Sequence, residues 1–419
     1  MSISFSFHSP ERRVQRLAPT LLLLFTTATP AVAAVLDDVS FSNRLQSELR
    51  YFWEDALYGQ TSPLRPSIAW EPEIAWRGES PISLYFKGFA RENFIGDSHR
   101  AHADVRELYA IYEGDSWDLV VGANKVFWGV TESRHLVDVI NQSDLIEDID
   151  GEDKLGQPML NLNMQAAWGR MAFFVLPYFR ERTLPHDNDR FRLPLSIEDD
   201  PAYDSGDEQW HPDLAFRYSH YIDSLDFGLS YFNGTNREPV YELELSPPAA
   251  AGLPPEASLR PRYTQMRQYG LDLQYTVDSW LLKLEAIYRS TPNDDFFASV
   301  SGFEYTMYQI FGTDGDLGLL LEYLNDRRDE RIDPVQGDDD IFAGLRWAAN
   351  DIDGTSVLGG AIVDLQGGAT FVSVEAERRL RDDIKLEFAI RMITEAAQDD
   401  SAFALRNDDY AELGLNYYF

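Results

Sequence analysis

The chain is dominated by segments in which apolar and polar residues alternate with a period of two. Over 41–53, apolar side chains fall on one side of an extended strand, and the charged side chains of Arg44, Glu48 and Arg50 fall on the other. The same pattern recurs over 280–289 and 384–393. Segments of about ten residues with aromatic residues near their ends are typical of tilted strands that face lipid on one side and water on the other. A soluble β-sandwich is the alternative, but its strands are shorter, at about 5 to 6 residues.

Eighteen segments fit this description. They are 41–53, 67–76, 82–91, 103–112, 117–126, 159–168, 171–181, 210–220, 225–232, 263–276, 280–289, 299–311, 317–325, 341–348, 355–364, 369–380, 384–393 and 409–419. Short and long connections alternate between them, which predicts an all-β fold: a transmembrane antiparallel β-barrel with short periplasmic turns, long extracellular loops and both termini in the periplasm. Sixteen strands are the alternative, because Arg106 and Glu107 blur the pattern over 103–112 and 365–368 is short for an extracellular loop.

The N-terminus has the pattern of a secretory signal peptide. Arg12, Arg13 and Arg16 precede an apolar stretch over 17–25, and small residues at 31–33 form a cleavage site. We therefore expect 1–33 to be removed and 34–419 to form a single barrel domain in the outer membrane of a Gram-negative cell. The first strand begins soon after the cleavage site, so no separate plug domain is expected.

Composition excludes several classes of protein. The chain has 70 acidic and 36 basic residues, and loss of 1–33, with three basic residues and one acidic residue, changes the net charge from −34 to −36. Such a chain repels nucleic acid phosphates. It has no cysteine, which excludes disulfides, thiolate metal sites and a cysteine nucleophile. No Gly-x-Ser-x-Gly motif is present either, and we expect no enzymatic activity.

The C-terminus resembles the closing-strand signal that barrel-assembly machinery reads. The resemblance rests on Glu412, Gly414, Tyr417 and Phe419. Leu413, Leu415, Tyr417 and Phe419 are expected to face lipid, because aromatic rings are favoured at the membrane interface.

The predicted barrel is wide enough to hold an aqueous lumen, because 16 to 18 strands leave one whereas eight do not. Strand parity directs basic side chains into it at Arg44, Arg50, Lys87, Arg91, Arg217, Lys283, Arg346 and Arg391, with acidic side chains among them. Opposed charges across a narrow passage orient small polar solutes. The alternative is that these are paired, solvated wall residues without a selective role. An apolar inner stripe is expected only over 171–181, at Phe174, Leu176 and Tyr178.

The connection 127–158 is the most distinctive stretch. Leu136, Val139 and Ile140 recur at helical spacing, which predicts a short amphipathic helix. Its apolar face gains by packing on the inner wall, so we expect this loop to fold into the lumen, with acidic side chains directed at wall residues such as Arg44, Arg50, Lys87 and Arg91. A helical cap across the rim is the alternative. The predicted pore constriction consists of Trp128, Glu132, Asp138, Asn141 and Asp144.

These same residues carry a family resemblance. Trp128 and Gly129 are followed by the acidic Glu132 and then by Asp138, Asn141 and Asp144 at intervals of three. This pattern resembles the outer-membrane barrel family DUF1302 over about thirty residues. The resemblance implies an outer-membrane barrel with suspected links to uptake or export of hydrophobic or organic molecules.

We therefore predict a porin-like channel for small polar or organic solutes. A barrel that transports lipids or hydrophobic compounds, or a barrel-type enzyme, is the alternative. No resident cofactor or metal is expected, apart from loosely bound Ca²⁺ at acidic outer loops such as 198–200, 204–208 and 338–340. The expected partners are outer-membrane lipid, lipopolysaccharide and the assembly machinery. Barrels of this size commonly form trimers, so a homotrimer is a further expectation.

Overall fold

The computed structural model of the protein describes residues 38–59, 62–95, 100–246, 256–328, 339–366, 368–394, 396–398 and 401–419. Val39–Phe419 form one compact unit. The predicted signal peptide, 1–33, lies outside the described residues. None of the helices in the described ranges is long and apolar enough to cross a bilayer.

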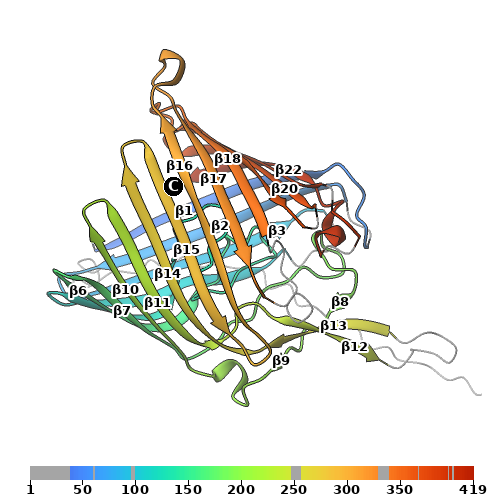
Figure 1. The fold of residues 1–419 in the computed structure, drawn as a ribbon, viewed down its shortest axis with the longest axis horizontal. Coiled ribbons are helices and arrows are strands. Elements are labelled where there is room, and N and C mark those ends of the chain that lie inside the picture. The colour runs from blue at the N-terminus through green and yellow to red at the C-terminus, as the bar shows by residue number, and fades with distance from the viewer. Residues whose placement is uncertain are drawn as a thin grey trace, which may run out of the picture. The chain divides into compact units, whose positions relative to one another are not determined.

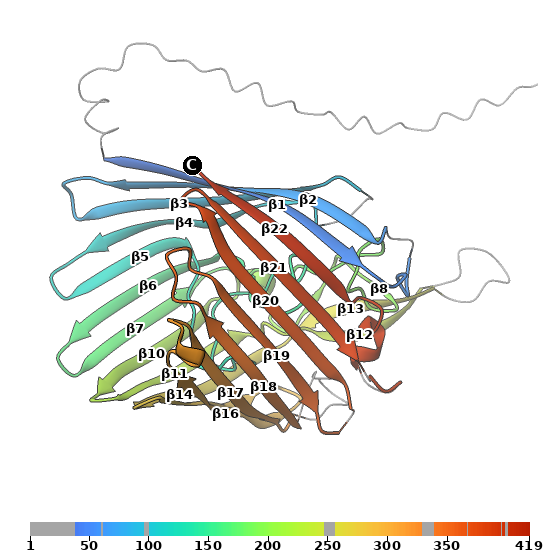
Figure 2. The ribbon, with the colours of Figure 1, turned by 90° about the horizontal axis from the view of Figure 1, so that it is seen from above.

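Within the unit Val39–Phe419, eighteen antiparallel strands form one closed barrel (Figure 1). They are β1 (Val39–Phe52), β2 (Leu64–Arg77), β3 (Ile82–Asn93), β4 (Ala103–Glu113), β5 (Trp117–Asn124), β6 (Gln157–Ala166), β7 (Gly169–Leu176), β10 (Asp213–Ile222), β11 (Leu225–Thr235), β14 (Gln265–Val277), β15 (Trp280–Ser290), β16 (Asp295–Met307), β17 (Asp316–Asp326), β18 (Asp339–Ala348), β19 (Ser356–Asp364), β20 (Thr370–Arg381), β21 (Ile384–Thr394) and β22 (Tyr410–Tyr418). The first strand pairs with the last, from Arg44 opposite Tyr418 to Phe52 opposite Tyr410. Figure 2 shows β1 and β22 side by side. The predicted fold class and the count of eighteen are confirmed, and the alternative of sixteen is wrong.

The strand with the blurred pattern, β4, contains an irregularity. Lys87 of β3 pairs with Glu107, but the next residue, Gly88, pairs with Val105. Arg106 is therefore an extra residue on β4 without a partner on β3, as in a β-bulge. The bulge shifts the alternation of side chains across Arg106, and this explains why the strict period of two fails there.

Side chains alternate between the lumen and the outer face as the pattern predicts. On β22, Leu413 and Leu415 are 48% and 41% exposed on the outer face, whereas Tyr410 and Asn416 are buried. Tyr417 and Phe419 are exposed as well, and their rings stack at 5.2 Å. The outer face is apolar because a barrel strand must present such side chains to lipid.

A second, smaller sheet lies on the long connections. It consists of β8 (Ser196–Ile197), β9 (Ala202–Tyr203), β12 (Val240–Ser246) and β13 (Glu256–Tyr263). The alternating pattern predicts no strand between 232 and 263, so the β12–β13 hairpin differs from the prediction. The remaining elements are short 3-10 helices: η1 (Glu208–Trp210), η2 (Ile310–Gly312) and η3 (Ser401–Leu405).

The connection between β5 and β6 is buried inside the barrel. We call residues 125–156 the plug segment. Trp128, Leu136, Val137, Val139 and Ile140 belong to one apolar cluster with inward-facing side chains of the wall, and each is at most 7% exposed. The plug segment therefore fills part of the lumen.

Candidate functional site

A glutamate of the barrel wall holds the start of the plug segment through its backbone. Oε1 of Glu285, on β15, accepts hydrogen bonds from the backbone N–H groups of Val130 at 2.7 Å and Thr131 at 3.1 Å. Oε2 accepts a third from the N–H of Val137 at 3.1 Å. Glu285 is fully buried. Charge-assisted hydrogen bonds are stronger inside a protein than in bulk water, so these three bonds hold the segment firmly.

A second wall glutamate continues this arrangement two strands away. Glu322, on β17, accepts from the backbone N–H of Glu132 at 2.9 Å and of Ser133 at 2.8 Å. The Ser133 hydroxyl donates to the same carboxylate at 2.6 Å. Two wall carboxylates therefore fix the path of residues 130–137 across the lumen.

Trp128 and Gly129 allow the chain to approach Glu285 closely. Trp128 packs edge-on against Phe174 of β7, with ring centroids 5.6 Å apart, and the guanidinium of Arg217 lies 5.2 Å from the Trp128 ring. Gly129 has φ +154°, and a Cβ atom there would lie 3.1 Å from Glu285 Oε1 and 2.9 Å from His135 Nδ1. A glycine is needed because a larger residue would push the chain away from the carboxylate.

The predicted amphipathic helix is absent. Residues 136–148 form turns and two isolated bridges, Ser143 with Lys154 and Asp144 with Thr183. The prediction was wrong. Carbonyl groups of the expected helix accept side-chain hydrogen bonds instead, Leu136 from Gln268 and Ile140 from Arg237. The N–H of Asp144 donates to the carbonyl of Asp153, not to that of Ile140. Val137, which lies off the predicted apolar face, is as deeply buried as Ile140.

The apolar part of the inner wall is larger than predicted. Only β7 was expected to supply it, but the cluster around the plug segment also includes inward-facing residues of later strands. They are Ala215, Phe232, Met266, Ile287, Phe296, Ala298, Val300, Leu320, Leu324 and Phe342. The plug segment covers much of this surface.

Asp138 and Asn141 stabilise the fold of the plug segment itself. Asp138 accepts from the backbone N–H of Trp128 at 3.3 Å and lies 3.4 Å from Lys154 Nζ. The Asn141 amide donates to the backbone carbonyls of Asn124 and Leu155, at 2.9 and 2.8 Å. Both side chains are buried, so their role is structural.

Asp144 joins the plug segment to the wall on the opposite side. It pairs with Arg106 of β4 at 2.6 Å and accepts from the Thr183 hydroxyl at 2.5 Å. Burial would raise the pKa of Asp144, but a hydrogen bond with His102 and the charge of Arg106 more than offset this and lower it. Glu147 pairs with Arg91 of β3 at 2.8 Å. Ion pairs therefore attach residues 144–147 of the plug segment to strands β3 and β4.

Between the plug segment and strands β17–β21 a cavity of about 510 Å³ remains. One side is apolar, with Phe342, Leu358, Ile362, Phe371 and Val372 among its residues. Charged side chains line the rest, namely the carboxylates Glu132, Asp150, Glu152, Asp340, Asp364 and Glu375 and the basic residues Arg134, His135 and Arg391. A cavity of this volume is in the range that holds small organic molecules, about 300–1,000 Å³.

Neighbouring groups shift the pKa values of three residues of the plug segment, of which His135 and Asp150 line this cavity and Asp153 does not. Burial lowers the pKa of His135, but hydrogen bonds with Glu152 and Glu285 more than offset this and raise it to about 10. Burial and the charge of Asp148 raise the pKa of Asp150 to about 6. Burial and the charges of Glu147 and Asp150 raise the pKa of Asp153 to about 7. His135 is therefore a cation at neutral pH, and the two aspartates titrate near it.

Of the five residues predicted at the constriction, only Glu132 lines the cavity. Its carboxylate lies 2.6 Å from Arg346 of β18 and 3.8 Å from Lys283 of β15. Trp128, Asp138, Asn141 and Asp144 are buried instead and hold the plug segment in place. The acidic residues of the plug segment also have other partners than the predicted Arg44, Arg50, Lys87 and Arg91. Glu132 pairs with Arg346 and Asp144 with Arg106, whereas Asp138 pairs with Lys154 of the segment itself.

All eight basic residues expected along the lumen face inward. Arg91, Arg217, Lys283, Arg346 and Arg391 contact the plug segment, through Glu147, Trp128, Glu132, Glu132 and Asp150 respectively. Arg50 lies 3.6 Å from Asp148. Arg44 and Lys87 pair with Glu71 of β2. At the C-terminus, Glu412 faces inward and pairs with Arg50.

Sequence reasoning missed the role of Glu285 and Glu322. Parity placed both in the lumen, but it gave no partner. A buried glutamate in the middle of a strand is the signal that could have marked them, because such a group needs donors close by. Their donors are backbone amides, which no side-chain pattern reveals.

No family model and no curated protein matches the chain in sequence. Among solved structures, it is similar to Wzi, an outer-membrane protein involved in group 1 capsule assembly in Escherichia coli and described as a carbohydrate-binding β-barrel. The identity is 11%, the TM-score is 0.51, and the match covers 92% of this chain and 86% of Wzi. OpdQ of Pseudomonas aeruginosa matches at 13% identity with a TM-score of 0.46, over 91% of this chain and 96% of OpdQ. A variant of the Rh. blastica porin matches at 12% identity with a TM-score of 0.43, over 91% of this chain and all of the porin. The chain thus has the fold of an outer-membrane β-barrel.

Proposed function

We propose that the protein is a porin-like channel of the outer membrane for small polar or organic solutes. One observation carries this proposal: a closed barrel retains a cavity of about 510 Å³ between its wall and the plug segment. The plug segment narrows the lumen without filling it on the side of β17–β21. The passage runs along charged and apolar surfaces together, which suits small molecules with both polar and apolar parts.

The charges of the cavity favour cations. Six carboxylates line it, against three basic side chains. Fixed charges of one sign in a narrow passage enrich counter-ions there. The acidic extracellular loops act in the same direction. We therefore propose a weak preference for cations.

Recording from single channels of the refolded mature chain in planar bilayers tests this proposal. We expect discrete conductance steps, and a salt gradient should give a reversal potential on the cation side. The absence of any conductance from correctly folded protein would contradict the channel. An anion-selective pore would contradict only the account of its selectivity.

A second candidate, a conduit for hydrophobic compounds, is favoured by the apolar side of the cavity. Leu358 and Ile362 lie on β19 at this surface. Replacing both by asparagine should slow the uptake of an aromatic alcohol into liposomes while leaving the uptake of glycerol unchanged. Equal slowing of both solutes would mean that the apolar surface has no part in selection.

The same proposal includes the location and partners of the protein. We propose that both termini lie in the periplasm, that β22 carries the signal for the assembly machinery, and that the chain forms a homotrimer among lipopolysaccharide molecules. We also propose kinship with DUF1302, on the ground that the residues of the shared pattern, Trp128, Gly129, Asp138, Asn141 and Asp144, stabilise the fold of the plug segment. Cross-linking in detergent tests the trimer.

A further inference from the structure

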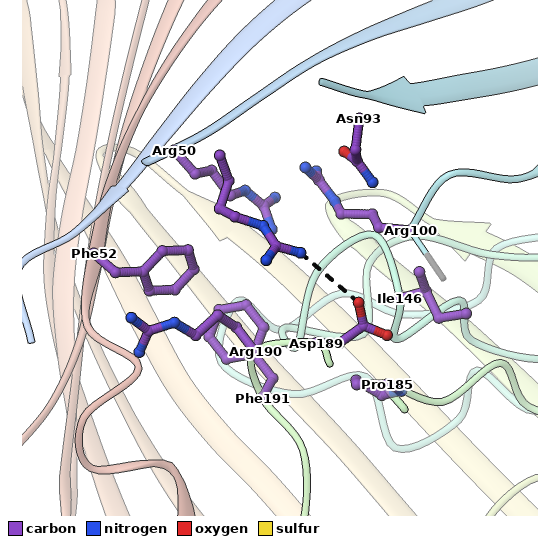
Figure 3. A pocket seen from close by; sticks show the side chains of 10 residues that line it. Arg50, Phe52, Asn93, Arg100, Ile146, Pro185, Asp189, Arg190 and Phe191 are labelled. Atoms are coloured by element: carbon purple, nitrogen blue, oxygen red, sulfur yellow. Dashed lines mark ion pairs between the residues drawn. The ribbon is translucent and has the colours of Figure 1, made fainter. Parts of the chain in front are cut away.

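A second, smaller pocket lies on the other side of the plug segment, where β1–β3 end beneath the long loops. Its volume is about 30 Å³, and four arginines line it: Arg50 of β1, Arg65 of β2, Arg100 of the β3–β4 connection and Arg190 of the β7–β10 connection. Asp189 is the single carboxylate in its lining. Figure 3 shows Arg50, Arg100, Arg190 and Asp189 around a common space. The pocket is therefore strongly basic within an acidic protein.

Three of these arginines are held by groups outside the lining. Arg50 pairs with Glu412 and, at 3.3 Å, with Glu48. Arg100 donates to Glu48 at 3.0 Å. Arg190 pairs with Asp408 at 3.1 Å and also donates to the backbone carbonyl of Glu54 at 2.7 Å. Their partners orient these guanidinium groups, and none of those partners lines the pocket.

Arg65 differs from the other three. Within the described ranges its one ion pair is with Asp189, at 3.8 Å, and a dashed line marks it in Figure 3. Its guanidinium makes no hydrogen bond to the described residues, although the side chain is only 9% exposed. A guanidinium has five N–H donors, and none of those of Arg65 is among the buried side-chain atoms without a hydrogen-bond partner, so they open onto the solvent of the pocket. Arg65 therefore presents unused donors to the pocket.

Two further donors at the pocket lack acceptors. Nε of Arg190 and Nδ2 of Asn93 are buried and have no hydrogen-bond partner in the described part of the chain. The Arg190 guanidinium is fixed in place, since it lies 4.4 Å from the Phe52 ring centroid. Phe191, beside it, adopts φ 61°, which is costly for a phenylalanine, and its N–H donates to Asp408 at 2.9 Å. The pocket is thus rigid and short of acceptors.

We propose that this pocket binds the carboxylate group of a small organic acid. Its volume is sufficient for about two water-sized atoms, since one water needs about 10–15 Å³. A carboxylate brings two oxygens in one plane, which match the fork of a guanidinium in a bidentate pair. The few carbon atoms of such an acid would lie against Ile146 and Pro185, which line the same pocket.

Equilibrium dialysis of the detergent-purified full barrel against radiolabelled acetate, in low-chloride zwitterionic buffer, tests this site. We expect one saturable site per chain. Arg65→Gln should weaken binding by about tenfold or more, because charge-assisted bidentate bonds are lost. Arg65→Lys keeps the charge without the fork and should weaken binding by a smaller factor. Arg378→Gln removes one arginine from β20, where Arg378 pairs with Asp353 away from the pocket, and should leave binding unchanged.

Two kinds of result would contradict this proposal, one the site itself and the other its preference for a carboxylate. Equal affinity in the wild type and Arg65→Gln, or no saturable binding at all, would overturn the site. Displacement of acetate by chloride as readily as by formate would overturn the carboxylate assignment, because the pocket would then recognise charge alone. If Arg65→Gln fails to give the heat-modifiable folded band on electrophoresis, Arg65→Lys carries the comparison. The measurement needs no conductance, so it stands apart from the proposed channel.

Discussion

The two sides of the plug segment are chemically opposite. Toward β17–β21 it leaves a cavity of about 510 Å³ with six carboxylates and an apolar surface. Toward β1–β3 it closes a pocket of about 30 Å³ with four arginines and one carboxylate. The difference teaches that a net charge of −34 says little about any one place in the lumen. A single segment divides the barrel into a path that suits cations and an enclosed site that suits an anion.

Removing most of the plug segment should have the largest effect on conductance. Deletion of 131–153 removes every contact of the segment to Glu322 and leaves only that of Val130 to Glu285. It merges the two sides into one wide lumen. We expect single-channel conductance to rise severalfold and ion preference to weaken, since a wider passage screens its wall charges. Bilayer recording measures both. The barrel should remain heat-resistant in detergent, because the eighteen strands pair without the segment. Unchanged conductance would place the narrowest point elsewhere.

Weakening the attachment of the plug segment to the wall should have an intermediate effect on conductance. Glu285→Gln combined with Glu322→Gln keeps the shape of both side chains but removes the charge that the backbone amides of 130–133 and 137 bind. Each hydrogen bond to a charged group contributes about 1.5–3 kcal/mol, so docking of the segment should weaken by several kcal/mol. We expect frequent switching between a low and a high conductance level.

The matched control for this variant is Glu377→Gln. Glu377 pairs with Lys385 of the neighbouring strand β21 and, among the described residues, makes no contact with the plug segment. It should leave the current record steady. Equal switching in both variants would show that lost wall charge, and not the release of the segment, causes the change.

Acidification should have the smallest effect and should act through two aspartates of the plug segment, Asp150 in the lining of the cavity and Asp153 outside it. Asp153, with a pKa of about 7, and Asp150, with a pKa of about 6, are charged at pH 8 and neutral at about pH 5. Because both pKa values are raised in the folded protein, the neutral forms favour docking of the segment, so docking should strengthen as the pH falls. Two negative charges are lost over the same range, and the cation preference should decline.

Reversal potentials measured from pH 8 to 5 follow this decline. Asp150→Asn combined with Asp153→Asn should show the weaker preference at every pH and a flat profile. A profile as steep as that of the wild type would assign the titration to other groups. Acetate binding should also survive in this double variant, because neither aspartate lines the arginine pocket.

The barrel was predictable because its signal is local. Each strand must present an apolar face to lipid, so every segment shows apolar and polar residues that alternate with a period of two. The pattern fails at Arg106 because a β-bulge lies there. Parity alone also placed Arg91, Lys283, Arg346 and Arg391 in the lumen. These inferences need no knowledge of which strands lie opposite one another.

The plug segment was less predictable because its contacts are distant in sequence. The spacing of Leu136, Val139 and Ile140 favours a helix locally, but the carbonyls of Leu136 and Ile140 accept hydrogen bonds from Gln268 and Arg237, 132 and 97 positions away. Tertiary contacts of this kind override weak helical preference. The arginine pocket is similar, since it draws Arg50, Arg65, Arg100 and Arg190 from four separate stretches of the chain, and no spacing pattern links them.

The anchoring of the plug segment by late strands sets the order in which the protein can assemble. The segment leaves the chain after β5, yet its acceptors lie on β15 and β17, and its partner Arg346 lies on β18. Hairpins can pair one after another as they enter the membrane, because each closes a short loop. The segment must wait until three-quarters of the barrel is in place, with its amides and apolar side chains exposed to lumen water. A newly inserted barrel is therefore an open pore, and narrowing of its passage is a late step of folding.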